Sequence, residues 1–277
     1  MGSDQHASGA APVDHRAFWD ALAQHHAAIE DNYLDRKTIR RIIHEMQSPV
    51  LVVGAGQGLL MEEIQKAGLE CDGIDWSREM IRIAKTRRGI DILHADARAM
   101  PIPDQHYGTV IYATGVIDFT DDEEGIQAML REGVRVVTPA GRIFIAFYRT
   151  SPVQELFVTR VGLLRNESLA FRETLGLYLL NPAQTIGWAA KRAGVSYFGG
   201  IMLFLRMAAF TTIQEKRTTV RMQNIVRGMP DPESFIRTAP ETQPYRNEAA
   251  VRSLFERLGF PVKRLDTFPA CFVAQIR

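Results

Sequence analysis

Three closely spaced glycines are the residues of this chain that most clearly indicate chemistry. Gly54, Gly56 and Gly58 follow an apolar, β-branched run at 50–53, and a helix-forming segment starts at Leu59. Glycine lets the backbone turn tightly and lets a ligand approach it closely, and the free N–H groups of the helix start face whatever sits in the turn. The segment predicts a nucleotide-binding corner between a buried strand and a helix. A tight turn without a ligand is the alternative.

The spacing of these glycines argues against a dinucleotide. The dinucleotide fingerprint Gly-x-Gly-x-x-Gly would place its third glycine at position 59, where this chain has Leu59. A second apolar run ends at Asp75. A carboxylate at that strand end is placed to accept both ribose hydroxyls of a bound adenosine, although a plain helix cap is the simpler alternative.

The glycine corner and Asp75 together resemble the S-adenosylmethionine (SAM) site of class I methyltransferases of the type 11-like group. Residues 73–80 read Gly-Ile-Asp-Trp-Ser-Arg-Glu-Met, close to that family's Gly-x-Asp-x-Ser-x-x-Met signature. Residues 95–104 are similar to its Gly-Asp-Ala…Leu-Pro-Phe-Pro-Asp pattern. The resemblance covers 50–148 well, 247–277 moderately and the intervening insertion not at all.

The resemblance implies SAM as the cofactor and S-adenosylhomocysteine as its product. It implies that Asp75 holds the ribose, that Asp96 accepts the adenine amine and that Ala97 offers its backbone N–H to the ring. The remaining cofactor contacts would come from the glycine corner, from residues beside the sugar and from the loop after the fourth strand: Gly54, Ala55, Gly56, Gly58, Trp76, Met80, Thr114 and Gly115. His26 takes the tyrosine place of the family's Asp-x-x-Ala-x-x-Tyr-like element, so His26 or Tyr33 would line the cofactor or the substrate, with packing as the alternative.

Several residues are candidates for a group that acts on the methyl acceptor, and no spacing singles one out: Asp118, Tyr148, Tyr178, Tyr197 and the histidines. A sulfonium methyl is already activated, so the protein's main task is to hold an acceptor lone pair in line with the carbon–sulfur bond. A base is needed only where the acceptor must lose a proton. Asp118 stands in a loop where many relatives have a histidine, and an ordinary surface aspartate is the alternative.

The elements that must position these residues alternate between strand and helix. Apolar runs predict strands at 50–53, 69–75, 107–113 and 141–148, a third strand from residue 90, and a turn at 138–141. Helices are expected across 15–46, from residue 59, at 76–86 with Ser77 as N-cap, and at 121–137. A last helix is expected from its cap at Asn247 through Leu258. A terminal pair of strands, 262–268 and 270–276, resembles the family's sixth strand and its antiparallel seventh. The expected fold class is α/β: a Rossmann-like, doubly wound, seven-stranded sheet with a mainly helical lid insertion.

The chain divides into three parts on this interpretation. Residues 1–14 form a disordered tail, 15–148 and 247–277 form the methyltransferase core with N-terminal helices, and 149–246 form a helical insertion, or lid, over the acceptor pocket. Helices are expected in the insertion at 153–164, 169–180, 183–193 and 201–213, bounded by Pro152, Asn181-Pro182 and Gly199-Gly200.

The segment 195–213 is the most apolar part of the insertion. Gly199-Gly200 and Arg206 interrupt it, so it is not expected to cross a membrane. A buried lid helix is the ordinary interpretation. The alternative is a surface within 195–221 that docks on a membrane or admits a lipid-like or aromatic acceptor, with Lys216, Arg217 and Arg221 meeting anionic headgroups.

Composition excludes several classes of protein. The chain has 277 residues, 46% of them hydrophobic, and a net charge of +1, so it has no global field that would gather nucleic acid. Cys71 and Cys271 lie too far apart in the sequence for a metal-binding motif, and no metal site is indicated. This cysteine content is consistent with a protein of the reducing cytoplasm, with peripheral contact with a membrane as an alternative. The leading interpretation is a SAM-dependent methyltransferase acting on a small or lipid-like acceptor. A non-catalytic SAM-binding module or sensor is the alternative, and an NAD-dependent oxidoreductase is disfavoured.

Overall fold

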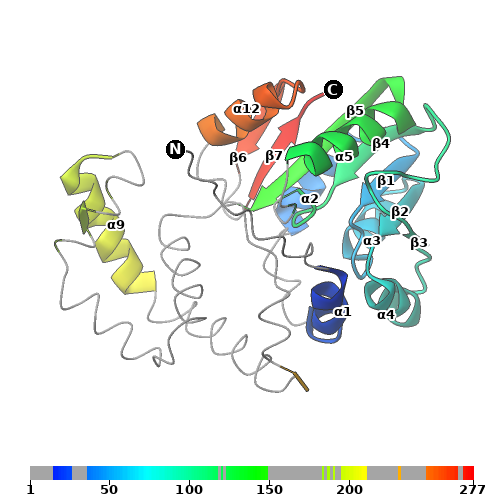
Figure 1. The fold of residues 1–277 in the computed structure, drawn as a ribbon, viewed down its shortest axis with the longest axis horizontal. Coiled ribbons are helices and arrows are strands. Elements are labelled where there is room, and N and C mark those ends of the chain that lie inside the picture. Colours follow the sequence, from blue (N-terminus) through cyan, green and yellow to red (C-terminus); the bar gives the residue numbers. More distant parts are fainter. Residues whose placement is uncertain are drawn as a thin grey trace, which may run out of the picture.

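The computed structural model shows an α/β fold built on one seven-stranded sheet (Figure 1). It describes residues 15–26, 36–117, 120, 123–148, 183, 186–187, 190, 195–210, 230–231, 248–267 and 271–277. The strands are β1 (Val50–Val53), β2 (Cys71–Asp75), β3 (Leu93–His94), β4 (Tyr107–Tyr112), β5 (Val137–Tyr148), β6 (Arg264–Thr267) and β7 (Cys271–Gln275). The helices are α1 (His15–His26), α2 (Arg36–Ile43), α3 (Leu59–Lys66), α4 (Arg78–Arg88), α5 (Glu123–Val136), α9 (Tyr197–Phe210) and α12 (Glu248–Arg257).

The order of the strands is β3-β2-β1-β4-β5-β7-β6, and β7 alone runs antiparallel to its neighbours. This arrangement confirms the predicted doubly wound sheet with an antiparallel last strand. The chain leaves β1 toward β2 on one side and later returns to β4 on the other side. In an open α/β sheet such a switch point, at the carboxyl ends of the strands, is where ligands bind.

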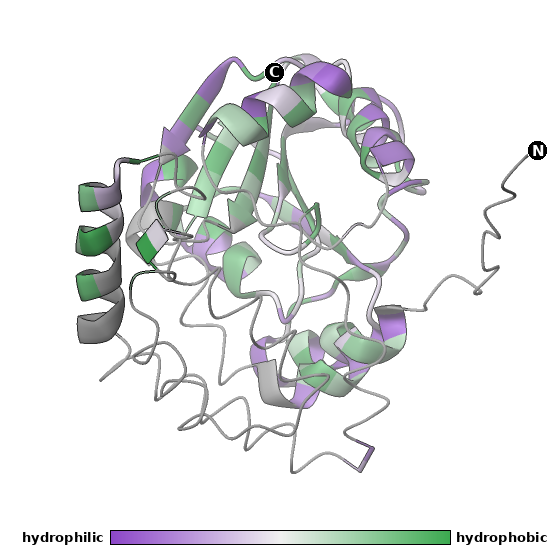
Figure 2. Ribbon diagram, turned by 60° about the vertical axis from the view of Figure 1, so that its left-hand side comes forward, coloured by the Kyte–Doolittle hydropathy of each residue, from purple (hydrophilic) through white to green (hydrophobic). Residues whose placement is uncertain are grey.

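The sheet is covered on both faces, which explains why its central strands are continuously apolar. All residues of β1 and β4 are buried. Alternate residues of β1 point to opposite cores: Leu51 and Val53 pack with α5 and α12, whereas Val50 and Val52 pack with α2 and α3. Hydrophobic colouring runs along the central strands of the sheet in Figure 2.

The N-terminal helical region consists of two helices within the described residues. Helix α2 belongs to the core on one face of the sheet, whereas α1 packs against α4. The contact between α1 and α4 is a small apolar cluster of Ala23, Met80 and Ile83, with Trp19 packed against it. Helix α1 therefore lies beside the first turns of α4, close to the glycine corner (Figure 1).

Three predicted boundaries are wrong. The strand expected from residue 90, β3, begins only at Leu93. The predicted turn at 138–141 is the irregular beginning of β5: pairing with β4 jumps from Tyr107–Val137 to Thr109–Arg142, and the extra residues are accommodated at that register shift. Gly199-Gly200 does not precede the next helix but lies inside α9. A Cβ on Gly200 would lie 2.7 Å from the Ile186 carbonyl oxygen, so glycine is used there because another segment packs closely against the helix.

Other predicted features lie outside the described residues. These are the tail 1–14 and the helices at 153–164 and 169–180; of the segment 183–193, residues 183, 186, 187 and 190 are described and helical. Within the described part of the chain, every helix is too short or too polar to cross a lipid bilayer.

Candidate functional site

The three glycines after β1 all adopt left-handed backbone conformations, with φ of 73° at Gly54, 53° at Gly56 and 83° at Gly58. Their surroundings differ. A Cβ on Gly54 would lie 2.1 Å from Cγ2 of Val116, so Gly54 allows the loop after β4 to pack against the turn. A Cβ on Gly56 would meet nothing within 4 Å. Gly56 is thus the point of the turn where a ligand can approach the backbone.

Asp75 connects the end of β2 to this turn. Its Oδ2 accepts the backbone N–H of Gly56 at 2.7 Å, and its Oδ1 accepts that of Ser77 at 2.8 Å. The Trp76 backbone N–H also acts on this carboxylate, and since a carboxylate has about four acceptor positions, it retains capacity for a further donor. Burial raises the pKa of the Asp75 carboxyl above its ordinary value, and the nearby Asp20 adds to this, while the backbone N–H bonds oppose the shift.

Two buried polar atoms at the switch point lack a hydrogen-bond partner within the described part of the chain: Thr114 Oγ1 and Gln57 Oε1. Thr114 belongs to the loop after β4, and Gln57 belongs to the glycine turn after the adjacent β1. A buried hydroxyl without a partner is costly unless a ligand supplies one. Together with the open space at Gly56 and the acceptor capacity of Asp75, the Thr114 hydroxyl fits a nucleoside-containing cofactor such as SAM.

Helix α1 is attached to the site by polar contacts that the sequence did not indicate. Asp20 Oδ1 accepts the Ser77 hydroxyl and, at 3.2 Å, the backbone N–H of Glu79, so it reinforces the N-terminus of α4. Ser77 itself caps α4, as predicted. The Gln57 amide donates to the Ala23 carbonyl oxygen at 2.5 Å. Asp20 and Ala23 are the first two matched positions of the Asp-x-x-Ala-x-x-Tyr-like element.

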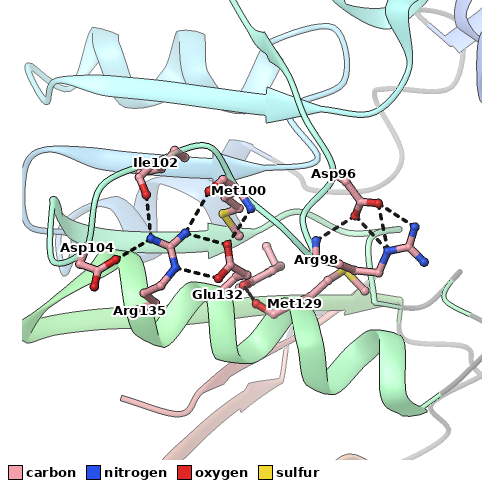
Figure 3. A network of polar contacts seen from close by, with 9 residues as sticks. Asp96, Arg98, Met100, Ile102, Asp104, Met129, Glu132 and Arg135 are labelled. Carbon is pink, nitrogen blue, oxygen red and sulfur yellow. Dashed lines mark hydrogen bonds and ion pairs between the residues drawn. The ribbon is translucent and has the colours of Figure 1, made fainter.

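Asp96 lies just beyond β3, and its carboxylate is bound by Arg98 (Figure 3). The Arg98 guanidinium donates to both carboxylate oxygens, at 2.7 Å from Nη2 to Oδ2 and 3.0 Å from Nε to Oδ1, and the Arg98 backbone N–H donates to Oδ1 at 2.8 Å. Burial is the largest single influence on the pKa of Asp96 and raises it. The contacts with Arg98, helped by the charge of Arg16, outweigh burial and hold that pKa below its ordinary value.

Two guanidinium groups lie over the ring of Trp76. Arg98 lies 5.1 Å and Arg16 of α1 lies 5.3 Å from the centroid of its ring. The indole is 38% exposed, so it is a surface residue at the edge of the site. The sequence predicted Trp76 near the sugar and adenine but gave no sign of either arginine, because no local spacing relates Arg16 to Trp76 or Trp76 to Arg98.

The segment 96–104 is held by α5 (Figure 3). Glu132 Oε2 accepts the Met100 backbone N–H at 2.6 Å. The Arg135 guanidinium donates to the carbonyl oxygens of Ile102 at 2.7 Å and Met100 at 3.0 Å, and it forms ion pairs with Glu132 and Asp104. The only signal in the sequence was the i, i+3 spacing of the two charged residues on α5.

The remaining predicted site residues lie in several environments. Met80 is buried between α1 and α4 rather than at the surface of the site. Ala55 is buried beside Gly54 and Gly56, Ala97 follows Asp96, and Gly115, with φ of 94°, follows Thr114. His26 and Tyr148 are the last residues of α1 and β5. Tyr33 and Asp118 lie outside the described residues. The structure thus brings the glycine corner, Asp75, Asp96, Ala97, Thr114 and Gly115 to the carboxyl ends of neighbouring strands.

Comparison with known proteins agrees with this geometry. Residues 50–141 match the model of a methyltransferase domain. The demethylmenaquinone methyltransferase of Corynebacterium urealyticum is 32% identical over 130 residues, covering 47% of this chain and 54% of that protein. That of Clavibacter sepedonicus is 22% identical over 202 residues, covering 69% of this chain and 77% of that protein. The chain spans about half the length of the Corynebacterium relative.

Solved structures that match part of the chain include a complex of DhpI with S-adenosylhomocysteine, at 19% identity and a TM-score of 0.42, covering 49% of this chain and 68% of that one. The glycopeptide N-methyltransferase MtfA in complex with SAM has 20% identity and a TM-score of 0.38, covering 43% of this chain and 52% of that one.

Proposed function

We propose that this chain, whose residues 50–141 form a class I methyltransferase domain, transfers the methyl group of SAM to a lipid-like acceptor. The observation that carries the proposal is the joining of β1 and β2 at the switch point: Asp75 binds the Gly56 backbone N–H at 2.7 Å beside a backbone that is open to a ligand. SAM supplies an activated methyl group, so the chain needs chiefly to bind and orient the two reactants.

In this proposal each part of the cofactor is bound by different residues of the site. Asp75 accepts the ribose hydroxyls with the acceptor positions that Gly56 and Ser77 leave open. Asp96 accepts the adenine amine and Ala97 offers its backbone N–H. Gly54, Ala55 and Gly58 shape the turn around Gly56, and Thr114 and Gly115 bind the methionine portion. The proposed neighbours of the cofactor also include His26, Tyr33, Trp76 and Met80. Of these, Met80 would pack below the residues that contact the cofactor, because it is buried.

The proposed acceptor is a quinone or a related lipid-like molecule. The curated relatives are named for methylation of demethylmenaquinone, and their similarity supports an acceptor of that class here. The insertion at 149–246 begins where β5 ends, at the same edge of the sheet as the site residues, so it is proposed to line the acceptor pocket and exclude water. Asp118 and Tyr148 are the proposed bases for an acceptor that must lose a proton.

Peripheral membrane contact through 195–221 is part of the proposal. Helix α9 carries Phe198, Met202 and Leu205 at helical spacing, and their exposed fractions are 70%, 47% and 54%. Lys216, Arg217 and Arg221 follow in the sequence and would meet anionic headgroups. An apolar helix face next to cationic residues is typical of proteins that bind the surface of a bilayer, where a lipid-like acceptor resides.

Calorimetric titration of the purified full chain with SAM and with S-adenosylhomocysteine tests the cofactor. Micromolar binding is expected for the wild type, with loss of binding in Asp75→Ala. Asp91→Ala is the matched control, because the Asp91 side chain is highly exposed and forms an ion pair with Lys85. Equal binding by Asp75→Ala, or no binding by a folded wild-type chain, would refute the proposal.

A second experiment separates an enzyme from a SAM-binding sensor. It measures methyl transfer from labelled SAM to a panel of quinones, phenols and lipids.

A further inference from the structure

We infer that Arg98 competes with the adenine of the cofactor for the carboxylate of Asp96, and so limits how tightly this site binds S-adenosyl compounds. The inference rests on the proposed function, since it concerns the adenine end of the same site. Its basis is the contact geometry of Asp96, Arg98 and Trp76 (Figure 3 shows the first two).

Arg98 engages both oxygens of the Asp96 carboxylate. A carboxylate has about four acceptor positions, two on each oxygen. Oδ1 accepts the Arg98 backbone N–H at 2.8 Å and its Nε–H at 3.0 Å, while Oδ2 accepts Nη2–H at 2.7 Å and shares Nε–H at 3.1 Å. An adenine amine that approaches either oxygen therefore competes with a guanidinium contact. Asp75 differs in this respect, because its contacts come from backbone N–H groups of the glycine turn and of the start of α4 and not from a guanidinium group.

Trp76 holds Arg98 in the competing position. The guanidinium of Arg98 lies 5.1 Å from the centroid of the indole ring, and Arg16 lies 5.3 Å from the same centroid. Each cation is attracted by the ring, and this attraction survives at partly exposed sites. Trp76, the residue after β2, therefore favours the arrangement in which Asp96 is bound to Arg98. Arg16 of α1 lies over the same ring and carries the same charge as Arg98, so it does not add to this preference.

The competition is modest in size and sensitive to salt. The side chains of Arg98 and Asp96 are 43% and 34% exposed, and ion pairs of this exposure contribute little because water and salt screen them. Opening the pair should weaken cofactor binding by about two- to fivefold. A competitor of this strength adjusts affinity without closing the site.

The test is calorimetric titration of S-adenosylhomocysteine into wild type, Arg98→Gln and Arg82→Gln at low and high ionic strength. Arg82 forms a comparable fork with Glu79 on α4 and serves as the matched control. Arg98→Gln should bind about two- to fivefold more tightly than wild type at low salt, and Arg82→Gln should equal wild type. The difference should shrink at high salt, because salt weakens the wild-type ion pair.

A double-mutant comparison distinguishes competition from a change in the fold. In the Asp96→Asn background the ion pair is already gone, so adding Arg98→Gln should give no gain in affinity. Equal or weaker binding by Arg98→Gln, with an unchanged melting temperature, would overturn the inference, and weaker binding would mean that Arg98 itself contacts the cofactor. Absence of binding by every variant, wild type included, would instead refute the proposed function and the inference with it.

Discussion

The carboxylate of Glu132 accepts the backbone N–H of Met100 at 2.6 Å, and this contact joins helix α5 to the segment that carries Asp96. Arg135, one turn further along α5, donates to two carbonyl oxygens of the same segment. The position of the proposed adenine carboxylate thus depends on a helix that contributes no residue to the site.

Replacing Glu132 by alanine should destabilise the protein and the site together. Glu132 is 17% exposed, and its loss leaves the Met100 N–H and part of the Arg135 guanidinium without partners. The free energy of unfolding should fall by about 1–3 kcal/mol, measured by urea denaturation. Arg131→Ala, which removes an exposed contact with Gln127, is the control and should change stability by less than about 0.5 kcal/mol. Equal stability of the two variants would contradict the role assigned to Glu132.

The same carboxylate should make stability depend on pH. The hydrogen bond from Arg135 is the main reason why the pKa of Glu132 lies below its ordinary value of 4.5. Because the folded-state pKa is the lower one, the contribution is complete above the unfolded-state pKa and is lost as the pH falls through the folded-state pKa. The urea midpoint of wild type should therefore fall more steeply below about pH 4.5 than that of Glu132→Gln. Parallel curves would show that Glu132 does not contribute to this dependence.

Gly56 and Gly68 form a matched pair for testing the open space in the glycine turn. Both have positive φ, 53° and 84°, and a Cβ on either would meet nothing within 4 Å. Alanine at each position should cost about 1–2 kcal/mol of stability from backbone strain alone. Only Gly56→Ala should also abolish binding of S-adenosylhomocysteine, because its methyl group would occupy the space proposed for the cofactor. Retained binding in Gly56→Ala would exclude close approach of a ligand there.

Helix α9 should determine membrane association if its exposed face docks on lipid. Phe198→Ser combined with Leu205→Ser should reduce cosedimentation with vesicles that contain anionic phospholipid by about tenfold, since each lost apolar side chain weakens burial in the interface. Leu93→Ser is the control, because Leu93 on β3 is 48% exposed yet lies in another part of the protein. An equal effect of Leu93→Ser, or no binding of wild type to any vesicle, would rule out docking through α9.

The sequence predicted the site best where a residue type directly follows a buried strand and has a specific structural role there. Gly54, Gly56 and Asp75 follow buried strands, and local pattern alone placed them at the ends of β1 and β2. Contacts between distant segments could not be predicted in this way. Nothing in the spacing of Arg98 indicates that it would bind Asp96 while lying against Trp76. The boundary error at Gly199-Gly200 has a related cause, since close packing against another segment, rather than a break in the helix, explains Gly200.

The position of β7 between β5 and β6 has a consequence for biosynthesis. β5 ends at Tyr148, but the strand that pairs with its free edge begins only at Cys271. During translation the edge of β5, with the buried Phe144 and Phe147 beside it, lacks its native partner until the whole insertion has been made. An apolar strand edge in this state can pair with another chain. Correct folding of the nascent protein therefore depends on how quickly the last strands are synthesised. A pause in translation within 149–270 should favour aggregation.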